Sequence, residues 1–166
     1  MFDWLTDEGD DAIAMLKRDH DRVKGLFERF ETAERKAEKR TIAKQAIEEL
    51  RIHSALEEEL FYPAIRGQLK DAVMNEADEE HHVANVLIAE LDAMNSADDH
   101  FDAKFTVLAE GVRHHIKEEE NDMLPKARDL EIDFKALGEK MERRRKELQA
   151  KGLPSTSEDA MIRMIK

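Results

Sequence analysis

The chain has 166 residues, a formal net charge of −12 and no cysteine, with only 6 glycines and 3 prolines. Its length suits a single domain, and its acidic charge argues against a nucleic-acid partner or an anionic membrane surface. The lack of cysteine excludes disulfides, thiolate ligands and a thiol nucleophile. A composition dominated by Ala, Leu and charged residues predicts an all-α protein.

The first half of the chain predicts two helices, because apolar residues recur at helical spacing. The first covers about residues 10–34, and the second begins near Thr41, whose hydroxyl suits an N-cap. The second pattern runs past Leu60 and weakens at Tyr62-Pro63, since proline interrupts helical hydrogen bonding. Gly67 then marks the turn to the next helix.

The second half predicts another pair of helices. A third helix is expected at about residues 69–94, and a fourth from near His100 to a point before Pro125, with the polar loop 95–99 between them. Four long helices joined by short loops lie antiparallel to their neighbours. We therefore expect an up-down-up-down four-helix bundle over residues 11–130, preceded by an N-terminal segment at 1–10.

Residues 131–166 are expected to form a short additional C-terminal helix, at about 134–150, and a tail. The tail carries an apolar triplet, Met161, Ile162 and Ile165. This triplet docks on the domain or on a partner subunit in a homo-oligomer, or else it frays. The basic run from Arg143 to Lys146 lies among glutamates and predicts a solvated face with local ion pairs.

One segment of the chain occurs twice with the same spacing. The motif His53-x-x-x-Glu57-Glu58, followed by Pro63, recurs as His115-x-x-x-Glu119-Glu120, followed by Pro125. The first and third helices match each other as well, because Asp19-His20 is paralleled by Glu80-His81. A repeat of this kind indicates a duplicated helical hairpin.

The repeat places polar side chains on helix faces that are otherwise apolar. Residues four apart lie one turn apart on one face, so each His-x-x-x-Glu pair presents an imidazole and a carboxylate to the core. A buried carboxylate without a counter-charge is costly, and a bound metal removes that cost. The candidate ligands are one histidine per helix and two glutamates: His20, His53, Glu57, His81, His115 and Glu119.

The ligand types restrict the metal. Imidazole and carboxylate without thiolate suit iron or manganese, and also zinc or copper. Two carboxylates that bridge, flanked by four histidines, suit a pair of divalent ions better than one ion. These six residues supply fewer donor atoms than two six-coordinate ions require, so solvent or an exogenous ligand must complete the site.

These motifs resemble those of the haemerythrin-like family, the HHE cation-binding domains, over roughly residues 11–130. The segments that carry the resemblance are LKRDHDRVKGLF, HSALEEELFYPAI, EEHHVANVLIAEL and HHIKEEENDMLP. The resemblance implies a left-handed four-helix bundle that holds a non-haem di-iron centre, with an oxo or hydroxo group between the irons. It also implies that the four histidines are terminal ligands and that Glu57 and Glu119 are bridges.

The function implied by the resemblance is binding of, or reaction with, O2, NO or peroxide. Two alternatives are an enzyme that oxidises iron or decomposes peroxide, and a regulatory bundle that responds to metal or redox state. Iron is favoured over manganese or zinc. Since no apolar run has the length of a membrane span or of a signal core, we expect a cytoplasmic protein.

Two positions depart from the family pattern. Oxygen-carrying haemerythrins are similar but have a further histidine four residues before the one on the third helix, where this chain has Ala77. Some relatives have a glutamate directly after the second-helix histidine, where this chain has Ser54. The corresponding metal position is open, or is filled by water, His82, His114 or Glu80.

Some neighbouring residues are assigned by the repeat or by their polarity. His115 is preferred over His114 as the fourth-helix ligand, because only His115 preserves the internal repeat. Tyr62 is expected at an amphipathic rim rather than as a hydrogen-bond donor beside the metal site. Four further glutamates are expected on solvated faces: Glu58, Glu59, Glu118 and Glu120. Of these, Glu58 and Glu120 are best placed to act beside the site.

Overall fold

The structure is a computed structural model that describes residues 11–95 and 97–165. Within these ranges the chain forms helices, turns and loops and no strand, so the predicted all-α class is confirmed. The N-terminal segment 1–10, including the expected start of the first helix at Asp10, lies outside the described residues. None of the described helices is long and apolar enough to cross a membrane.

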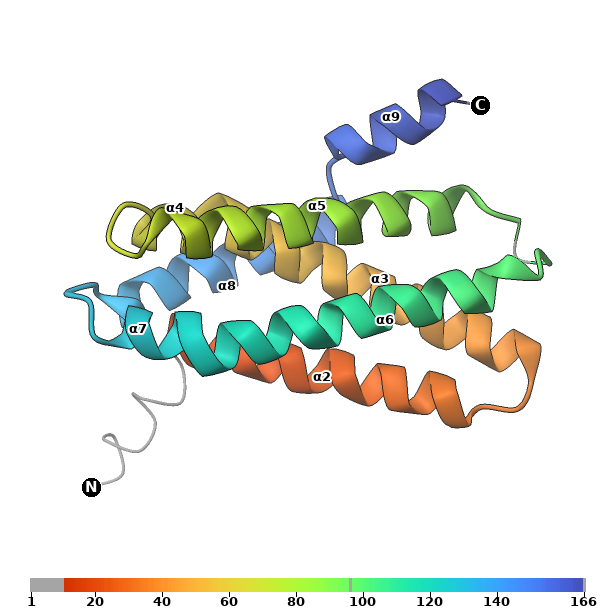
Figure 1. Cartoon of the computed structure of the whole chain (residues 1–166), viewed down its shortest axis with the longest axis horizontal. Coiled ribbons are helices and arrows are strands. Elements are labelled where there is room, and N and C mark those ends of the chain that lie inside the picture. The colour runs from red at the N-terminus through yellow and green to blue at the C-terminus, as the bar shows by residue number, and fades with distance from the viewer. Residues whose placement is uncertain (1–10, 96, 166) are drawn as a thin grey trace.

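Four long helical stretches form the bundle and alternate in direction (Figure 1). The first and third are α2 (Ala12–Thr32) and α5 (Asp71–Ala93). The second consists of α3 (Lys36–Leu56), a π-helical turn η1 (Glu57–Phe61) and α4 (Tyr62–Ile65). The fourth likewise consists of α6 (His100–Glu118), η2 (Glu119–Met123) and α7 (Leu124–Arg128).

The predicted start of the second helix was wrong. Helix α3 begins at Lys36, and Thr41 lies inside it, where its hydroxyl donates to the carbonyl oxygen of Ala37 at 3.1 Å. The first turn is held by the buried Arg40, which lies over the ring of Phe101 and donates to Asp102. This contact with α6 and the good helix formers at 36–40 extend the helix beyond the point that a capping residue indicates.

The prolines also differ from expectation, because they interrupt neither helical stretch. The fourth stretch continues through Pro125 to Arg128, and the second through Pro63 to Ile65. Gly67, with φ at +88°, then makes the predicted turn, a backbone conformation that glycine adopts without strain.

Two more helices cover the outside of the bundle. Helix α8 (Phe134–Lys151) packs against α2 and α3 and ends at Gly152, and α9 (Ser157–Ile165) lies on α5 (Figure 1). The tail therefore docks as a helix, but two members of its apolar triplet, Met161 and Ile165, are exposed. The homo-oligomer that such residues suggest stays a prediction.

The bundle has two hydrophobic clusters, one toward each end. One contains Leu16, Leu56 and Phe61 and includes residues of α8. The other contains Phe27 and Phe105, whose rings lie 5.8 Å apart. The candidate histidines and glutamates belong to neither cluster, so they form a polar layer between two apolar ends that hold the four helices at a fixed separation.

Candidate metal centre

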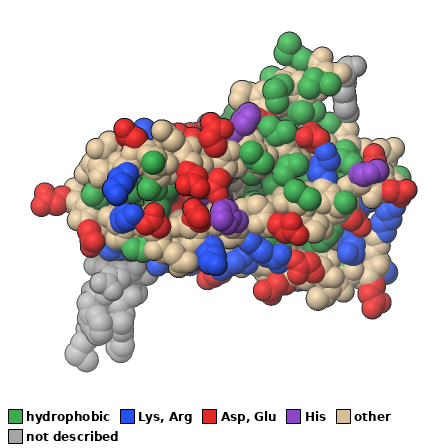
Figure 2. Space-filling model, in the orientation of Figure 1, with side chains coloured by type: hydrophobic (Ala, Val, Ile, Leu, Met, Phe, Trp, Pro, Cys, Tyr) green, Lys and Arg blue, Asp and Glu red, His purple; other side chains and the backbone are tan. Residues whose placement is uncertain are grey.

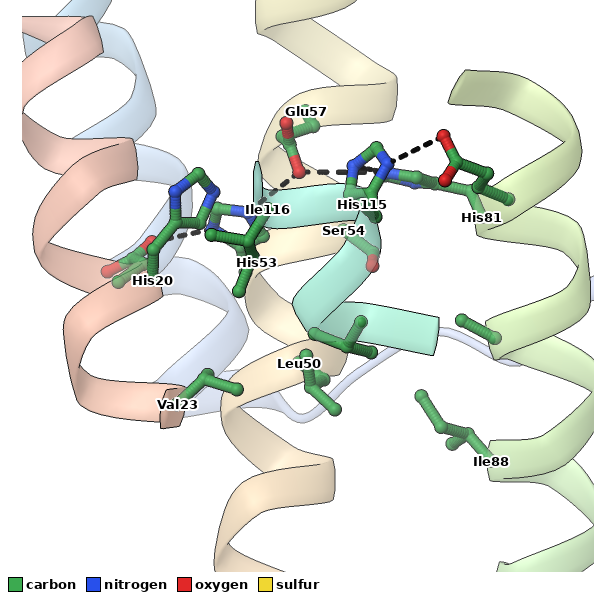
Figure 3. Close-up of a pocket in the computed structure, with 14 residues that line it drawn as sticks. His20, Val23, Leu50, His53, Ser54, Glu57, His81, Ile88, His115 and Ile116 are labelled. Carbon is green, nitrogen blue, oxygen red and sulfur yellow. Dashed lines mark hydrogen bonds and ion pairs between the residues drawn. The ribbon is translucent and has the colours of Figure 1, made fainter. Parts of the chain in front are cut away.

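Each of the four bundle helices contributes one inward-facing histidine to the polar layer. The reason is local, since each histidine occupies a position of an apolar stripe and has a buried apolar residue one turn before it: Leu16, Leu50, Ala77 and Val112. In Figure 3 the four imidazoles point toward one another, with Glu57 on one side and apolar side chains on the other. The histidines are His20, His53, His81 and His115.

Both candidate glutamates stand at the first position of a π-helical turn. The carbonyl oxygen of Glu57 accepts from the amide of Tyr62, five residues on, and Glu119 makes the same bond. In each case a proline follows the residue whose amide donates this bond: Pro63 follows Tyr62, and Pro125 follows Leu124. Proline has no N–H to donate and crowds the preceding turn, and the wider π turn accommodates it. The disturbance that proline causes thus begins at the glutamate itself.

The six candidate residues converge into two triads. In each triad the possible ligand atoms lie within 4.8 Å of one another. Each triad contains the two histidines of one helical hairpin and the glutamate of the other hairpin. The triads are His20, His53 and Glu119, and Glu57, His81 and His115.

Glu57 lies between the two triads and is fully buried. Its Oε1 atom is 2.7 Å from His53 Nε2, which belongs to the first triad, and 3.6 Å from His81 Nε2, which belongs to the second. Neither oxygen of Glu57 has a hydrogen-bond partner, although the distance to His53 is short, because the angles do not suit a hydrogen bond. A carboxylate in this position can bridge two ions.

Glu119 occupies the matching position from the other side. Its Oε1 atom is 3.3 Å from His20 Nε2, and its Oε2 atom is 3.0 Å from His115 Nε2. Both nitrogens of His20 and the Oε1 atom of Glu119 are buried without a hydrogen-bond partner. Buried polar atoms are rarely left unsatisfied, so their convergence fits a site built to surround a cation.

Each histidine also faces a second carboxylate through Nδ1, its other ring nitrogen. Such a contact orients the ring and leaves Nε2 free to bind a metal. For three of the four this contact is a hydrogen bond, whereas His20 and Glu120 are at ion-pair distance without hydrogen-bond geometry. The pairs are His20 with Glu120 at 3.3 Å, His53 with Asp19 at 3.0 Å, His81 with Glu58 at 3.1 Å, and His115 with Glu80 at 3.2 Å.

This outer ring of carboxylates follows the internal repeat. Asp19 and Glu80 each precede a histidine in the chain, and each contacts the histidine of the next bundle helix. Glu58 and Glu120 each follow a buried glutamate, and each contacts a histidine of the other hairpin. The expectation that Glu58 and Glu120 lie on solvated faces was therefore incomplete. The repeated pairs Asp/Glu-His and Glu-Glu were the signal for their role.

Arg145 of α8 distinguishes one half of the site from the other. Its Nη2 atom donates to both oxygens of Asp19, at 2.9 and 2.7 Å, and both residues are buried. Burial alone raises the pKa of Asp19, but the hydrogen bonds from His53 and Arg145 outweigh it and hold that pKa below its ordinary value. The expectation that the whole basic run 143–146 is solvated was wrong at Arg145, because the bundle alone does not cover Asp19.

Tyr62 is a member of the site, and the expectation of a rim position was wrong. Its side chain is 1% exposed, and its hydroxyl donates to Glu119 Oε2 at 2.7 Å. The hydroxyl oxygen of Tyr62 also lies 3.2 Å from His81 Nε2 and 3.2 Å from His115 Nε2. The π turn at Glu57 rotates Tyr62 inward, which the helical spacing of the sequence does not indicate.

Ala77 is the position on the third bundle helix where the sequence departs from the pattern of oxygen-carrying haemerythrins. Ala77 is buried in the same apolar cluster as Tyr62. The other candidates for this place lie elsewhere: His82 pairs with Glu158 of α9, and the half-exposed His114 pairs with Glu118. His115, and not His114, belongs to a triad, and the choice of His115 as the ligand stays a prediction.

A small cavity borders the histidines on the side away from Tyr62. Its volume is about 30 Å³, and Ser54, Val23, Leu50 and Ile88 contribute to its lining (Figure 3). Since about 10–15 Å³ of such space holds one water molecule, the cavity accommodates a molecule of two or three atoms. Ser54, the residue that replaces a glutamate of some relatives, leaves this space open.

The charges of the site have a consequence for metal binding. Burial lowers the pKa of His53, but the charges of Glu57 and Asp19 and the hydrogen bond with Asp19 raise it to about 10. The pKa of His81 and that of His115 are likewise raised to about 10, against burial, by hydrogen bonds and charges of the neighbouring glutamates. The neighbouring carboxylates thus favour the protonated form of these imidazoles in the metal-free protein.

Metal binding to the apoprotein at pH 7 is expected to release protons, because a ligating Nε2 atom must be deprotonated. Because the neighbouring carboxylates favour protonated imidazoles, we expect more than one and up to about three protons per chain, and an apparent affinity that rises as pH increases toward 10. Calorimetric titration in buffers with different ionisation enthalpies measures this number. Binding without proton release would contradict the assigned ligands.

Comparisons with known proteins agree with this geometry. The family model "Hemerythrin HHE cation binding domain" matches residues 11–127. The crystal structure of a hemerythrin HHE cation-binding domain-containing protein from Mycobacterium kansasii is similar in fold, with a TM-score of 0.72 and 24% identity, over 85% of this chain and 88% of that chain. None of the curated proteins matches the sequence.

Proposed function

The chain belongs to the hemerythrin HHE cation-binding domain family, and from this premise we propose that it is a non-haem di-iron protein that binds or reacts with O2, NO or peroxide. The observation that carries the proposal is the pair of buried triads whose unsatisfied nitrogen and oxygen atoms converge. Glu57 and Glu119 would bridge the ions, and His20, His53, His81 and His115 would be terminal ligands.

The donor set supports iron over the other candidate metals. Each triad offers two imidazoles and one carboxylate, the combination typical of non-haem Fe(II) sites that keep open positions. Even with both glutamates shared, each ion would have fewer protein donors than an octahedral site requires. When bound, the two ions would supply an open coordination position and two electrons for a small ligand.

The cavity supports a small and largely apolar ligand. Its volume of about 30 Å³ excludes an organic substrate, and its lining contains aliphatic side chains such as Leu50, Ile88 and Val112. The residues around it have distinct tasks. The outer carboxylates hold the imidazole rings in place, and the Tyr62 hydroxyl holds a proton that it donates to Glu119.

Replacing Tyr62 with phenylalanine is expected to leave the metal content unchanged and to slow the oxidation of the reduced protein by peroxide about tenfold. The substitution removes a hydrogen bond to a charged group, and such a bond is worth about 1.5–3 kcal/mol. Burial and the charges of Glu119 and Glu57 raise the pKa of Tyr62, which keeps the hydroxyl protonated as a donor. Stopped-flow absorption and metal analysis provide the two measurements.

The outcome of this substitution separates three roles for Tyr62. A slower reaction with full metal content supports a donor that acts on the reaction. Loss of metal would instead make the tyrosine oxygen a necessary ligand. An unchanged rate would leave Tyr62 with a role in packing alone, and the reaction proposal would lose its proton donor.

The proposal as a whole is tested in two steps. Metal analysis of protein produced with sufficient iron should give two irons per chain, and a content near zero for every transition metal would overturn it. Anaerobic reduction followed by titration with O2, NO and peroxide, observed by visible absorption, then distinguishes the alternatives. A stable, reversible spectral change indicates a carrier or sensor, whereas repeated consumption of peroxide indicates an enzyme.

A further inference from the structure

A second and much larger space lies beside the cavity at the metal centre. It is a groove of about 560 Å³ on the outer face between α5 and α6. Figure 2 shows this face, with hydrophobic side chains between the two helices and acidic side chains beside them. Val83 and Val107, which line the groove, are 58% and 54% exposed.

The groove and the inner cavity share part of their walls. Glu80, Ala84 and Val112 line both spaces. Ala84 is partly buried and has the smallest side chain of the three, while Val112 is 7% exposed. At this point a single layer of side chains therefore separates the groove from the cavity, and two of these side chains, Ala84 and Val112, are small and apolar.

The histidines nearest to the groove belong to one triad. His81 stands on α5 and His115 on α6, the two helices that form the groove, and Glu80 binds the Nδ1 atom of His115. The His115 side chain is 12% exposed, the largest value among the four histidines. The second triad, Glu57, His81 and His115, thus contains the most exposed of them, whereas α8 and Arg145 cover part of the first triad.

The groove has a charge of one sign. Four glutamates line it, Glu76, Glu79, Glu80 and Glu110, against a single histidine, His114, and its lining contains no lysine or arginine. Low-dielectric walls concentrate the field of such charges and repel anions from the entrance.

We propose that small ligands enter the metal centre through the groove between α5 and α6, past Ala84 and Val112, and that its glutamates admit neutral molecules and exclude anions. The inference deepens the proposed function by naming its ligand class: neutral O2, NO or hydrogen peroxide rather than anions such as azide or nitrite. The apolar walls suit the neutral diatomic molecules, and the four carboxylates oppose a negative charge.

The charge selectivity can be measured without any metal, because the chain has no cysteine. Ala84→Cys places a single reporter thiol at the wall of the entrance, and Ala37→Cys places a control thiol on the exposed first turn of α3. Each apoprotein is treated with neutral methyl methanethiosulfonate and with its anionic sulfonatoethyl analogue. We expect the ratio of anionic to neutral rates to be about tenfold lower at Ala84 than at the control.

Salt and charge removal provide the accompanying checks. The difference between the two sites should shrink at 1 M salt, where charges are screened within about 3 Å. The double substitution Glu79→Gln with Glu110→Gln should also raise the rate of the anionic reagent at Ala84→Cys. Equal ratios at the two sites, or no response to salt and charge removal, would overturn the exclusion of anions.

The route itself is tested in the iron-loaded protein by stopped-flow mixing with NO. Ala84→Leu should slow NO binding severalfold and Val112→Ala should accelerate it, with metal content unchanged, whereas Ala37→Leu should have no effect. Unaltered NO rates in both entrance variants, in protein that holds iron, would overturn the route alone. Absence of iron would overturn the proposed function while the thiol result still decides whether the groove excludes anions.

Discussion

Protein in which Glu119 is replaced by alanine is expected to bind at most one of the two proposed metal ions. Glu119 contacts His20 through one oxygen and His115 through the other, so its loss removes a donor from both triads. The residual site of one triad keeps Glu57 and two histidines, which is enough for a single weakly bound ion. Metal analysis after anaerobic loading with Fe(II) measures the stoichiometry.

The neighbouring residue provides a matched control for this substitution. Glu118 is 47% exposed, and its nearest basic contact is with the half-exposed His114. Glu118→Ala should therefore retain both ions and the wild-type spectrum. If Glu119→Ala also retained two ions while folding normally by circular dichroism, Glu119 would not be a bridge and the paired-ion site would need other ligands.

Replacing Arg145 with methionine is expected to lower the free energy of unfolding by about 3 kcal/mol or more, the usual cost of leaving a buried charge without its partner. Asp19 is 3% exposed and would keep only its contact with His53 Nδ1 at 3.0 Å and a longer one, 3.8 Å, with Nη1 of the half-exposed Arg22. Methionine preserves much of the side-chain volume, so the loss reports the ion pair rather than a cavity. Urea unfolding of the apoprotein, in which metal does not contribute, measures the change.

The adjacent arginine is the control for this measurement. Arg144 binds Glu59 at 2.7 Å on the surface, where solvent screens the pair, and Arg144→Met should change the stability far less. The two arginines are neighbours on α8, but Arg145 faces the bundle and Arg144 faces solvent. Similar midpoints for both would show that Arg145 and Asp19 contribute no more than a surface pair does.

The helices were predictable because their information is local. Apolar residues three and four positions apart indicated each bundle helix, and the spacing of His53 with Glu57 and of His115 with Glu119 indicated which polar side chains face inward. The errors occurred where a contact from another helix or a local departure from α-helical hydrogen bonding decides. Helix α3 starts before Thr41 because Arg40 is held by α6, and helices continue through Pro63 and Pro125 because a π turn absorbs each proline.

The candidate site was predictable in its six inner residues and much less so in their surroundings. The internal repeat singled out the histidines and glutamates, since duplication at matched spacing is visible in the sequence alone. Which carboxylate contacts which histidine depends on the neighbouring helix, so Asp19 could not be assigned to His53, or Glu80 to His115, before the helices were packed.

The sequence by itself thus determined that this protein is a helical bundle with four histidines and two glutamates directed into its core. The tertiary structure decided which of them meet, and it alone placed the Tyr62 hydroxyl, Arg145 and the groove between α5 and α6 beside them. The physical reason is that helical periodicity fixes the face of a helix on which a side chain lies. Contacts between faces depend on the rotation and offset of helices that are distant in the chain.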